Sequence, residues 1–106
     1  MQEENNTKIA VFKKKEIRKV IYNNEWWFSV IDVCSALTDS VDPGAYWRKL
    51  KQRLKEEGSE VVTFCHGLKL EAADGKKYET ECSNTEGVFR IMQSIPSPKA
   101  EPFLRV

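Results

Sequence analysis

Hydrophobic and polar residues alternate near the N-terminus in a pattern that predicts a small antiparallel sheet. We expect strands over residues 9–12, 17–22 and 25–29, joined first by a charged tip at 13–16. The second connection is Asn23-Asn24, because asparagine tolerates the left-handed dihedrals of tight turns. The residues before the first strand are polar, so we expect 1–7 to be a loose tail and 8–106 to be the folded domain.

Apolar residues at helical spacing predict about four helices later in the chain. They are expected over residues 30–38, 43–57 and 85–95, with a fourth that begins at 97–98. Ser29, Asp42, and either Asn84 or Thr85 stand where an N-cap is needed, since their side chains can accept a hydrogen bond from a free helix amide. Gly58 and Pro96 stand where the second and third helices should stop.

The segment between the second and third predicted helices has β-strand character. Residues 61–66 are rich in β-branched side chains and predict a strand. Residues 68–72 and 77–82 flank Asp74-Gly75, which is a strong hairpin turn signal. The whole pattern therefore predicts a single compact α+β domain, with a small antiparallel sheet and hairpins and about four helices.

The helix predicted over 43–57 carries a run of basic residues with no acidic residue until Glu56. At about 100° per residue, its apolar side chains fall on one face. These are Tyr46, Trp47, Leu50 and Leu54. The opposite face carries Arg48, Lys51, Gln52 and Lys55. A positive stripe behind an apolar anchor suits a polyanion such as nucleic acid, and the alternative is an ordinary solvated helix surface.

A second basic cluster surrounds the tip of the first predicted hairpin. It consists of Lys13, Lys14, Lys15, Arg18 and Lys19. Together with the helix it forms a candidate clamp on duplex DNA, with Lys13, Lys14, Lys15, Arg18, Arg48, Lys51 and Lys55 on the backbone and Gln52 at a base edge. Lysines at a β-tip also discourage edge-to-edge aggregation, which is the alternative role for this cluster.

Three consecutive aromatic residues, Trp26-Trp27-Phe28, lie on the third predicted strand. Strand alternation sends Trp27 to one face and Trp26 to the other. Core packing on both faces is the interpretation that we favour, and an exposed Trp26 that binds a partner protein is the alternative. The formal net charge of +1 also allows the second role, because the molecule as a whole is not a polycation.

The composition, 41% hydrophobic and 31% charged over 106 residues, is that of one folded domain. No apolar run is long enough to span a membrane and no signal peptide is visible, so we expect a cytoplasmic protein. Three cysteines without a Cys-x-x-Cys pair, and a single histidine next to Cys65, do not form a zinc pattern. We therefore predict neither a cofactor nor a metal, and no enzyme activity.

The order of these features resembles the N-terminal domain of the BRO family, which is shared with phage antirepressors. The resemblance rests on residues 26–33 (WWFSVIDV) after Ile17-Arg18-Lys19, and on residues 84–90 (NTEGVFR). Residues 95–103 (IPSPKAEPF) are similar to the DNA-damage-inducible protein D branch. The resemblance to the BRO family covers about residues 8–106 and implies an α+β DNA-binding regulatory domain of phage or prophage type.

The resemblance also sets the expected partners. It implies DNA, most simply a duplex, and through the damage-inducible branch it also implies a recombinase as protein partner. The alternative function is a protein-interaction module that acts on a repressor or recombinase without direct DNA contact. The resemblance does not identify which side chains touch DNA. It also leaves the oligomeric state undetermined, and a homodimer is one possibility. Because the chain stops inside the last predicted helix, we expect it to be a piece of a longer protein.

Overall fold

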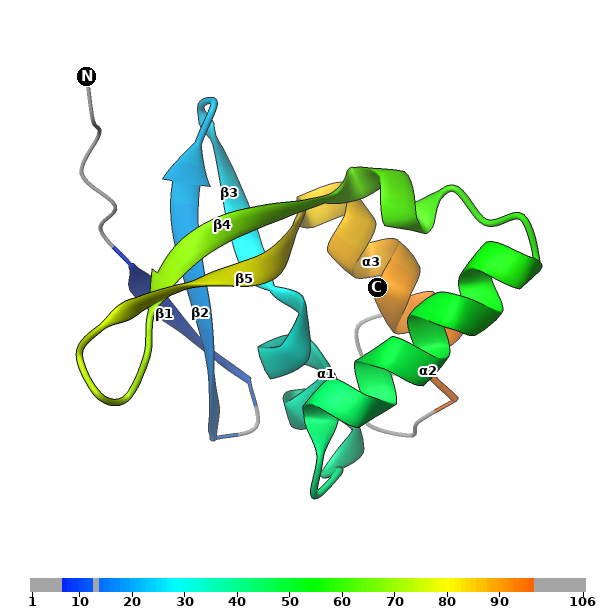
Figure 1. Cartoon of the computed structure of the whole chain (residues 1–106), viewed down its shortest axis with the longest axis horizontal. Coiled ribbons are helices and arrows are strands. Elements are labelled where there is room, and N and C mark those ends of the chain that lie inside the picture. The colour runs from blue at the N-terminus through cyan, green and yellow to red at the C-terminus, as the bar shows by residue number, and fades with distance from the viewer. Residues whose placement is uncertain (1–6, 13, 97–106) are drawn as a thin grey trace.

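The computed structural model describes residues 7–12 and 14–96, and they form one compact α+β domain built on a five-stranded antiparallel sheet (Figure 1). The strands are β1 (Lys8–Phe12), β2 (Lys15–Tyr22), β3 (Glu25–Ser29), β4 (Cys65–Glu71) and β5 (Lys77–Asn84). Their order in the sheet is β1-β2-β3-β5-β4. The predicted N-terminal meander is confirmed, although β2 begins two residues earlier than expected because Lys15 pairs with Phe12.

Three α-helices lie in the described part of the chain: α1 (Val30–Thr38), α2 (Pro43–Glu56) and α3 (Thr85–Ser94). Their predicted N-caps are confirmed, since Ser29, Asp42 and Asn84 each accept a hydrogen bond from a first-turn amide. Gly58 follows α2 with φ 77°, the left-handed conformation that ends a helix. The fourth predicted helix, from 97–98 onward, falls outside the described residues.

The strand predicted over residues 61–66 is wrong in its first part. Val61–Phe64 forms a short 3-10 helix, η1, and β4 begins only at Cys65. Local hydrogen bonds explain the difference: the amide of Val61 donates to the Ser59 hydroxyl at 3.2 Å, and the Thr63 hydroxyl donates to the Glu60 carbonyl at 2.6 Å. Such side-chain bonds offer the backbone a turn in place of a sheet partner, despite its β-branched side chains.

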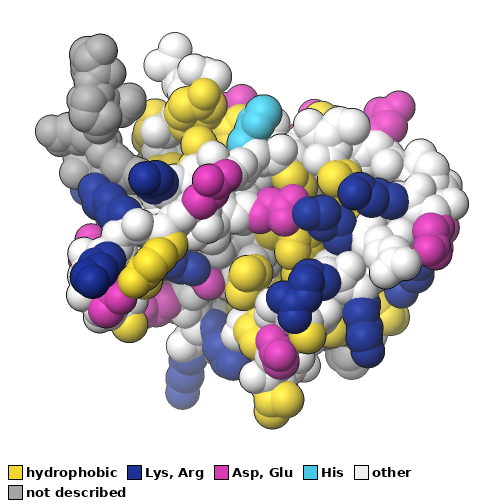
Figure 2. Space-filling view, in the orientation of Figure 1, with side chains coloured by type: hydrophobic (Ala, Val, Ile, Leu, Met, Phe, Trp, Pro, Cys, Tyr) yellow, Lys and Arg dark blue, Asp and Glu magenta, His cyan; other side chains and the backbone are white. Residues whose placement is uncertain are grey.

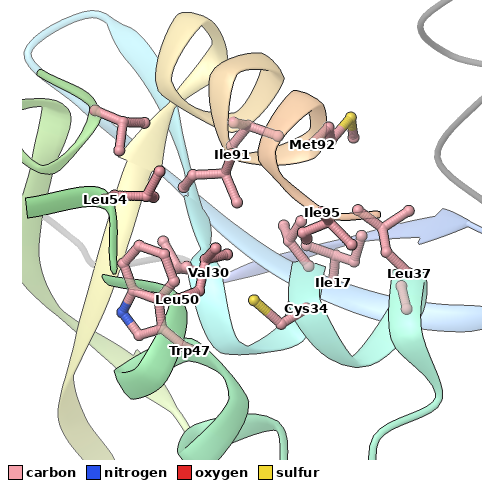
Figure 3. Close-up of a cluster of buried hydrophobic side chains, with 14 residues drawn as sticks. Ile17, Val30, Cys34, Leu37, Trp47, Leu50, Leu54, Ile91, Met92 and Ile95 are labelled. Atoms are coloured by element: carbon pink, nitrogen blue, oxygen red, sulfur yellow. The ribbon is translucent and has the colours of Figure 1, made fainter. Parts of the chain in front are cut away.

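The three helices cover one face of the sheet and enclose the main core (Figure 1). Figure 3 shows side chains from α1, α2 and α3 converging there with Ile17 of β2. Val30, Cys34 and Ile91 are completely buried at its centre. Burial of apolar surface stabilises a fold by about 25 cal/mol per Å², and burial in this shared core fixes the helices on the sheet.

The sheet is strongly curled, so that β4 passes across β2 and β3 (Figure 1). The amide of Glu71, at the end of β4, donates to the Thr7 hydroxyl at 3.2 Å, beside the start of β1. A second, smaller cluster fills the inside of this curl and consists of Val20, Trp27, Leu70 and Cys82. Trp27 is therefore a core residue, and its indole N–H donates to the Tyr22 carbonyl at 2.9 Å.

Candidate nucleic-acid interface

Helix α2 is anchored by the apolar face that the sequence predicts. Trp47, Leu50 and Leu54 are buried in the main core, and Tyr46 packs against its edge. The indole N–H of Trp47 also donates to a carboxylate oxygen of Glu81 on β5 at 2.9 Å. These contacts fix the helix on the domain, and its opposite face points outward.

The predicted outer stripe of α2 divides into free and engaged side chains. Arg48 and Lys55 are exposed, and neither forms an ion pair with another described residue. Lys51 is instead held by both oxygens of Glu81 at 3.1 Å, and its side chain is only 32% exposed. Gln52 is exposed, and its amide donates to Glu56 at 3.3 Å. Arg48 and Lys55 are thus free to contact another molecule, whereas Lys51 and Gln52 already have partners, a difference that helical projection does not indicate.

The tip of the first hairpin lies beside the connection between α1 and α2. The ammonium group of Lys15 is 3.6 Å from a carboxylate oxygen of Asp39, the residue that ends α1. Lys14 is exposed and adopts φ 68° at the turn. Lys13 falls outside the described residues. The structure therefore brings Lys14 and Lys15 to the end of the molecule where α2 begins.

Arg18 occupies an internal position instead. Its Nε and Nη2 donate to the two carboxylate oxygens of Asp32 at 2.8 and 3.1 Å, and Nη1 donates to the Glu71 carbonyl at 3.1 Å. The hydrogen bond to Asp32 raises the pKa of the guanidinium above its ordinary value. Arg18 thus joins β2, α1 and β4, which is a structural task that the sequence does not reveal.

Trp26 is half-buried, and the ammonium group of Lys19 lies 4.1 Å from the centroid of its ring. A cation over the ring face stabilises this arrangement and occupies the surface on which a base would stack. A protein-binding role for Trp26 remains a prediction.

The register of the β4–β5 hairpin places His66 directly opposite Cys82, a juxtaposition that residue spacing alone does not predict. The His66 ring lies 4.9 Å from the Trp27 ring, and the Cys82 thiol donates to the Thr80 carbonyl at 3.3 Å. Burial raises the pKa of Cys82 to about 12, the opposite of what a nucleophilic thiolate needs. Within the part of the chain that the structure describes, no group of His, Cys, Asp and Glu could hold a metal ion.

An apolar groove of about 270 Å³ lies between β1, α1 and α3. Its lining includes Phe12, Leu37, Val88 and Met92. Val11 and Phe89 also line it, and they are 68% and 45% exposed. Sequence reasoning missed this groove because residues of five separate elements line it. The one available signal was Phe89, an apolar residue of α3 outside the buried stripe of that helix.

These features define a small α+β domain whose long basic helix is anchored by an apolar face, with a lysine-bearing hairpin tip beside it. The family model described as BRO family, N-terminal domain, matches residues 16–106, so the chain belongs to this family. Membership is consistent with a DNA-binding regulatory domain of the antirepressor type, in a family not known for enzymes. No curated protein and no solved structure matches the chain. No helix of the described residues is long and apolar enough to cross a membrane.

Proposed function

We propose that this domain binds duplex DNA as part of a cytoplasmic regulator of the prophage antirepressor or DNA-damage-inducible type. One observation carries the proposal: exposed cations gather over α2, whose other face is fixed in the core, and the hairpin tip lies at its start (Figure 2). Lys14, Arg48 and Lys55 are the phosphate contacts that fit best, since each is exposed. Lys15 and Lys51 would first have to leave their carboxylate partners.

The salt dependence of duplex binding tests this proposal. Each phosphate contact contributes about 0.9 to the slope of log K against log salt concentration, because binding releases condensed counterions. Replacing Lys14, Arg48 and Lys55 together by Ala should flatten that slope by up to about 2.7, or three contacts of about 0.9 each. The matched control is Lys76→Ala in the turn of the β4–β5 hairpin, away from α2. A slope that the triple variant leaves unchanged would remove α2 and the tip from the interface.

A second candidate function is a protein-interaction module that acts on a repressor or recombinase without touching DNA. The apolar groove favours it, because a cleft with exposed Val11 and Phe89 at its rim is typical of surfaces that bind protein segments. The test compares how tightly two variants bind the purified repressor or recombinase. Phe89→Ala, in the groove, should bind more weakly than the control Tyr78→Ala, which removes a similarly exposed aromatic ring outside the groove. Equal binding by both variants would argue against the groove.

A further inference from the structure

The first half of α2 carries cations that are unpaired within the described chain and have no acidic neighbour in the sequence, whereas Lys55, also unpaired there, is followed by Glu56 and Glu57 near the end of the helix. Arg48 and Lys49 are exposed, and neither forms an ion pair with any residue that the structure describes. Arg53, further along, donates to the Ser94 carbonyl at 2.9 Å and lies 3.7 Å from Glu57. The helix ends among acidic residues: Glu56, Glu57 and Glu60 are all exposed. A polyanion is therefore attracted more strongly to the first half of α2 than to its end, where the glutamates offset Lys55.

The same end of α2 begins with the small residues Gly44 and Ala45 after Pro43, and the Arg48 guanidinium covers part of this turn. Gly44 lies in the first turn, and a Cβ added there would sit 3.5 Å from Nη1 of Arg48, so the guanidinium lies back over this turn. Such a distance is ordinary van der Waals contact, which means that the position does not require glycine for the fold. A glycine that the fold does not need, next to a free arginine, lets another molecule approach the helix backbone closely.

Val41 adds an apolar group to this end. It lies in the short link between α1 and α2 and is fully exposed, with a relative exposure of 103%. The ion pair between Lys15 and Asp39 holds the hairpin tip against the same link. Three separate segments thus meet at this end, and we call the exposed Lys14, Val41, Arg48 and Lys49, together with the half-buried Gly44, the leading surface.

We infer that the leading surface is the part of the domain that enters the major groove of duplex DNA, with Val41 against the methyl group of a thymine. The inference rests on the proposed function and adds two points to it. The first is the polarity of α2, meaning which end of the helix faces the DNA, and the second is a residue that distinguishes one base from another. The major groove is wide enough for an α-helix, and the thymine methyl is the apolar group that it displays. Arg48 then lies within reach of phosphates or a guanine edge, and Gln52 lies farther from the bases.

Uracil substitution tests the Val41 contact directly. A preferred duplex is first selected from a random pool with the full chain, and each thymine is then replaced by uracil, which lacks only the methyl group. We expect one replacement to weaken binding about fourfold, the value of one buried methyl group. The Val41→Ala variant should bind the thymine and uracil forms of that site almost equally. If Val41→Ala stays as sensitive to uracil as the parent chain, or if selection yields no preferred sequence, the contact is refuted.

Two further variants test the polarity of α2. Gly44→Ala should leave the fold as stable or make it more stable, because alanine is the better helix former, while it weakens duplex binding by at least threefold. Arg48→Ala should flatten the salt slope by about 0.9, whereas Lys55→Ala near the other end of α2 should change it far less, so that of the three candidate phosphate contacts Lys14 and Arg48 would account for most of the change in the triple variant. Equal changes from Arg48→Ala and Lys55→Ala would refute the polarity and leave the proposed function standing. Absence of any duplex binding at low salt would refute both.

Discussion

The ion pair between Arg18 and Asp32 is the connection whose removal has the clearest consequence. Arg18→Met keeps the length and the apolar stem of the side chain but removes every donor of the guanidinium. The Asp32 carboxylate then keeps one protein donor outside its own helix, the backbone amide of Arg18 at 3.0 Å. The carbonyl of Glu71 loses the donor that links β4 to β2. The variant therefore leaves a largely buried charge poorly paired.

The expected loss of stability follows from burial and from the bonds that are broken. The Arg18 and Asp32 side chains are 24% and 18% exposed, so water can compensate only in part. Breaking a fully buried pair from one side costs about 3–5 kcal/mol, and a hydrogen bond to a charged group contributes about 1.5–3 kcal/mol. With partial exposure, we expect Arg18→Met to lower the free energy of unfolding by about 2–3 kcal/mol. For a domain of this size that corresponds to a fall in Tm of about 10–20 °C.

Urea unfolding of four proteins measures the coupling: the parent chain, Arg18→Met, Asp32→Asn and the double variant. We expect the double variant to be less destabilised than the sum of the single variants, by about 1–2 kcal/mol. Duplex binding by Arg18→Met, measured below its unfolding transition, should keep the parent salt slope. Strict additivity, or a slope that falls by about 0.9, would show that Arg18 works at the surface and that this reasoning is wrong.

Two further outcomes follow from the packing. Gly87→Ala should destabilise the domain by about 2 kcal/mol in thermal or urea unfolding, because a Cβ at Gly87 would overlap the buried Ser83 hydroxyl and lie 2.9 Å from Cβ of Phe64; unchanged stability would contradict this close approach. Burial raises the pKa of the Cys65 thiol to about 11, so its alkylation at pH 8 should be about 100-fold slower in the folded than in the unfolded chain. The same shift implies that stability is fully present below pH 9, where the unfolded thiol is also protonated, and falls as the pH rises from 9 towards 11.

Local patterns in the sequence were enough to predict most of the fold. The helix caps at Ser29, Asp42 and Asn84 are properties of neighbouring residues, and so is the two-sided pattern of α2. The strands of the N-terminal meander can be predicted in the same way, because Asn23-Asn24 marks the turn between two of them. Both residues adopt the positive φ that this turn requires. Each of these features depends on contacts within a few positions along the chain.

The parts that sequence reasoning missed depend on contacts between distant segments. Lys51 and Glu81 are thirty positions apart in the sequence, and they meet only because the fold places α2 beside β5. Arg18 reaches Asp32 and Glu71 for the same reason, through the curl of the sheet. A helical projection treats every outward lysine as equally free, because it contains no information about the element that lies opposite.

The distribution of ion pairs also explains how a chain of net charge +1 can present a positive surface. Surface charges act over about a Debye length, which is about 8 Å at physiological ionic strength, so a distant group has little influence on a contact. Two acidic residues next to α2 pair with its cations: Glu81 of β5 holds Lys51, and the exposed Glu57, just after the helix, lies against Arg53. No such partner stands beside Arg48 among the described residues. What a polyanion meets is therefore set by which cations the fold leaves unpaired. Among the described residues of α2 these are Arg48 and Lys49 in its first half, and Lys55 beside Glu56 near its end.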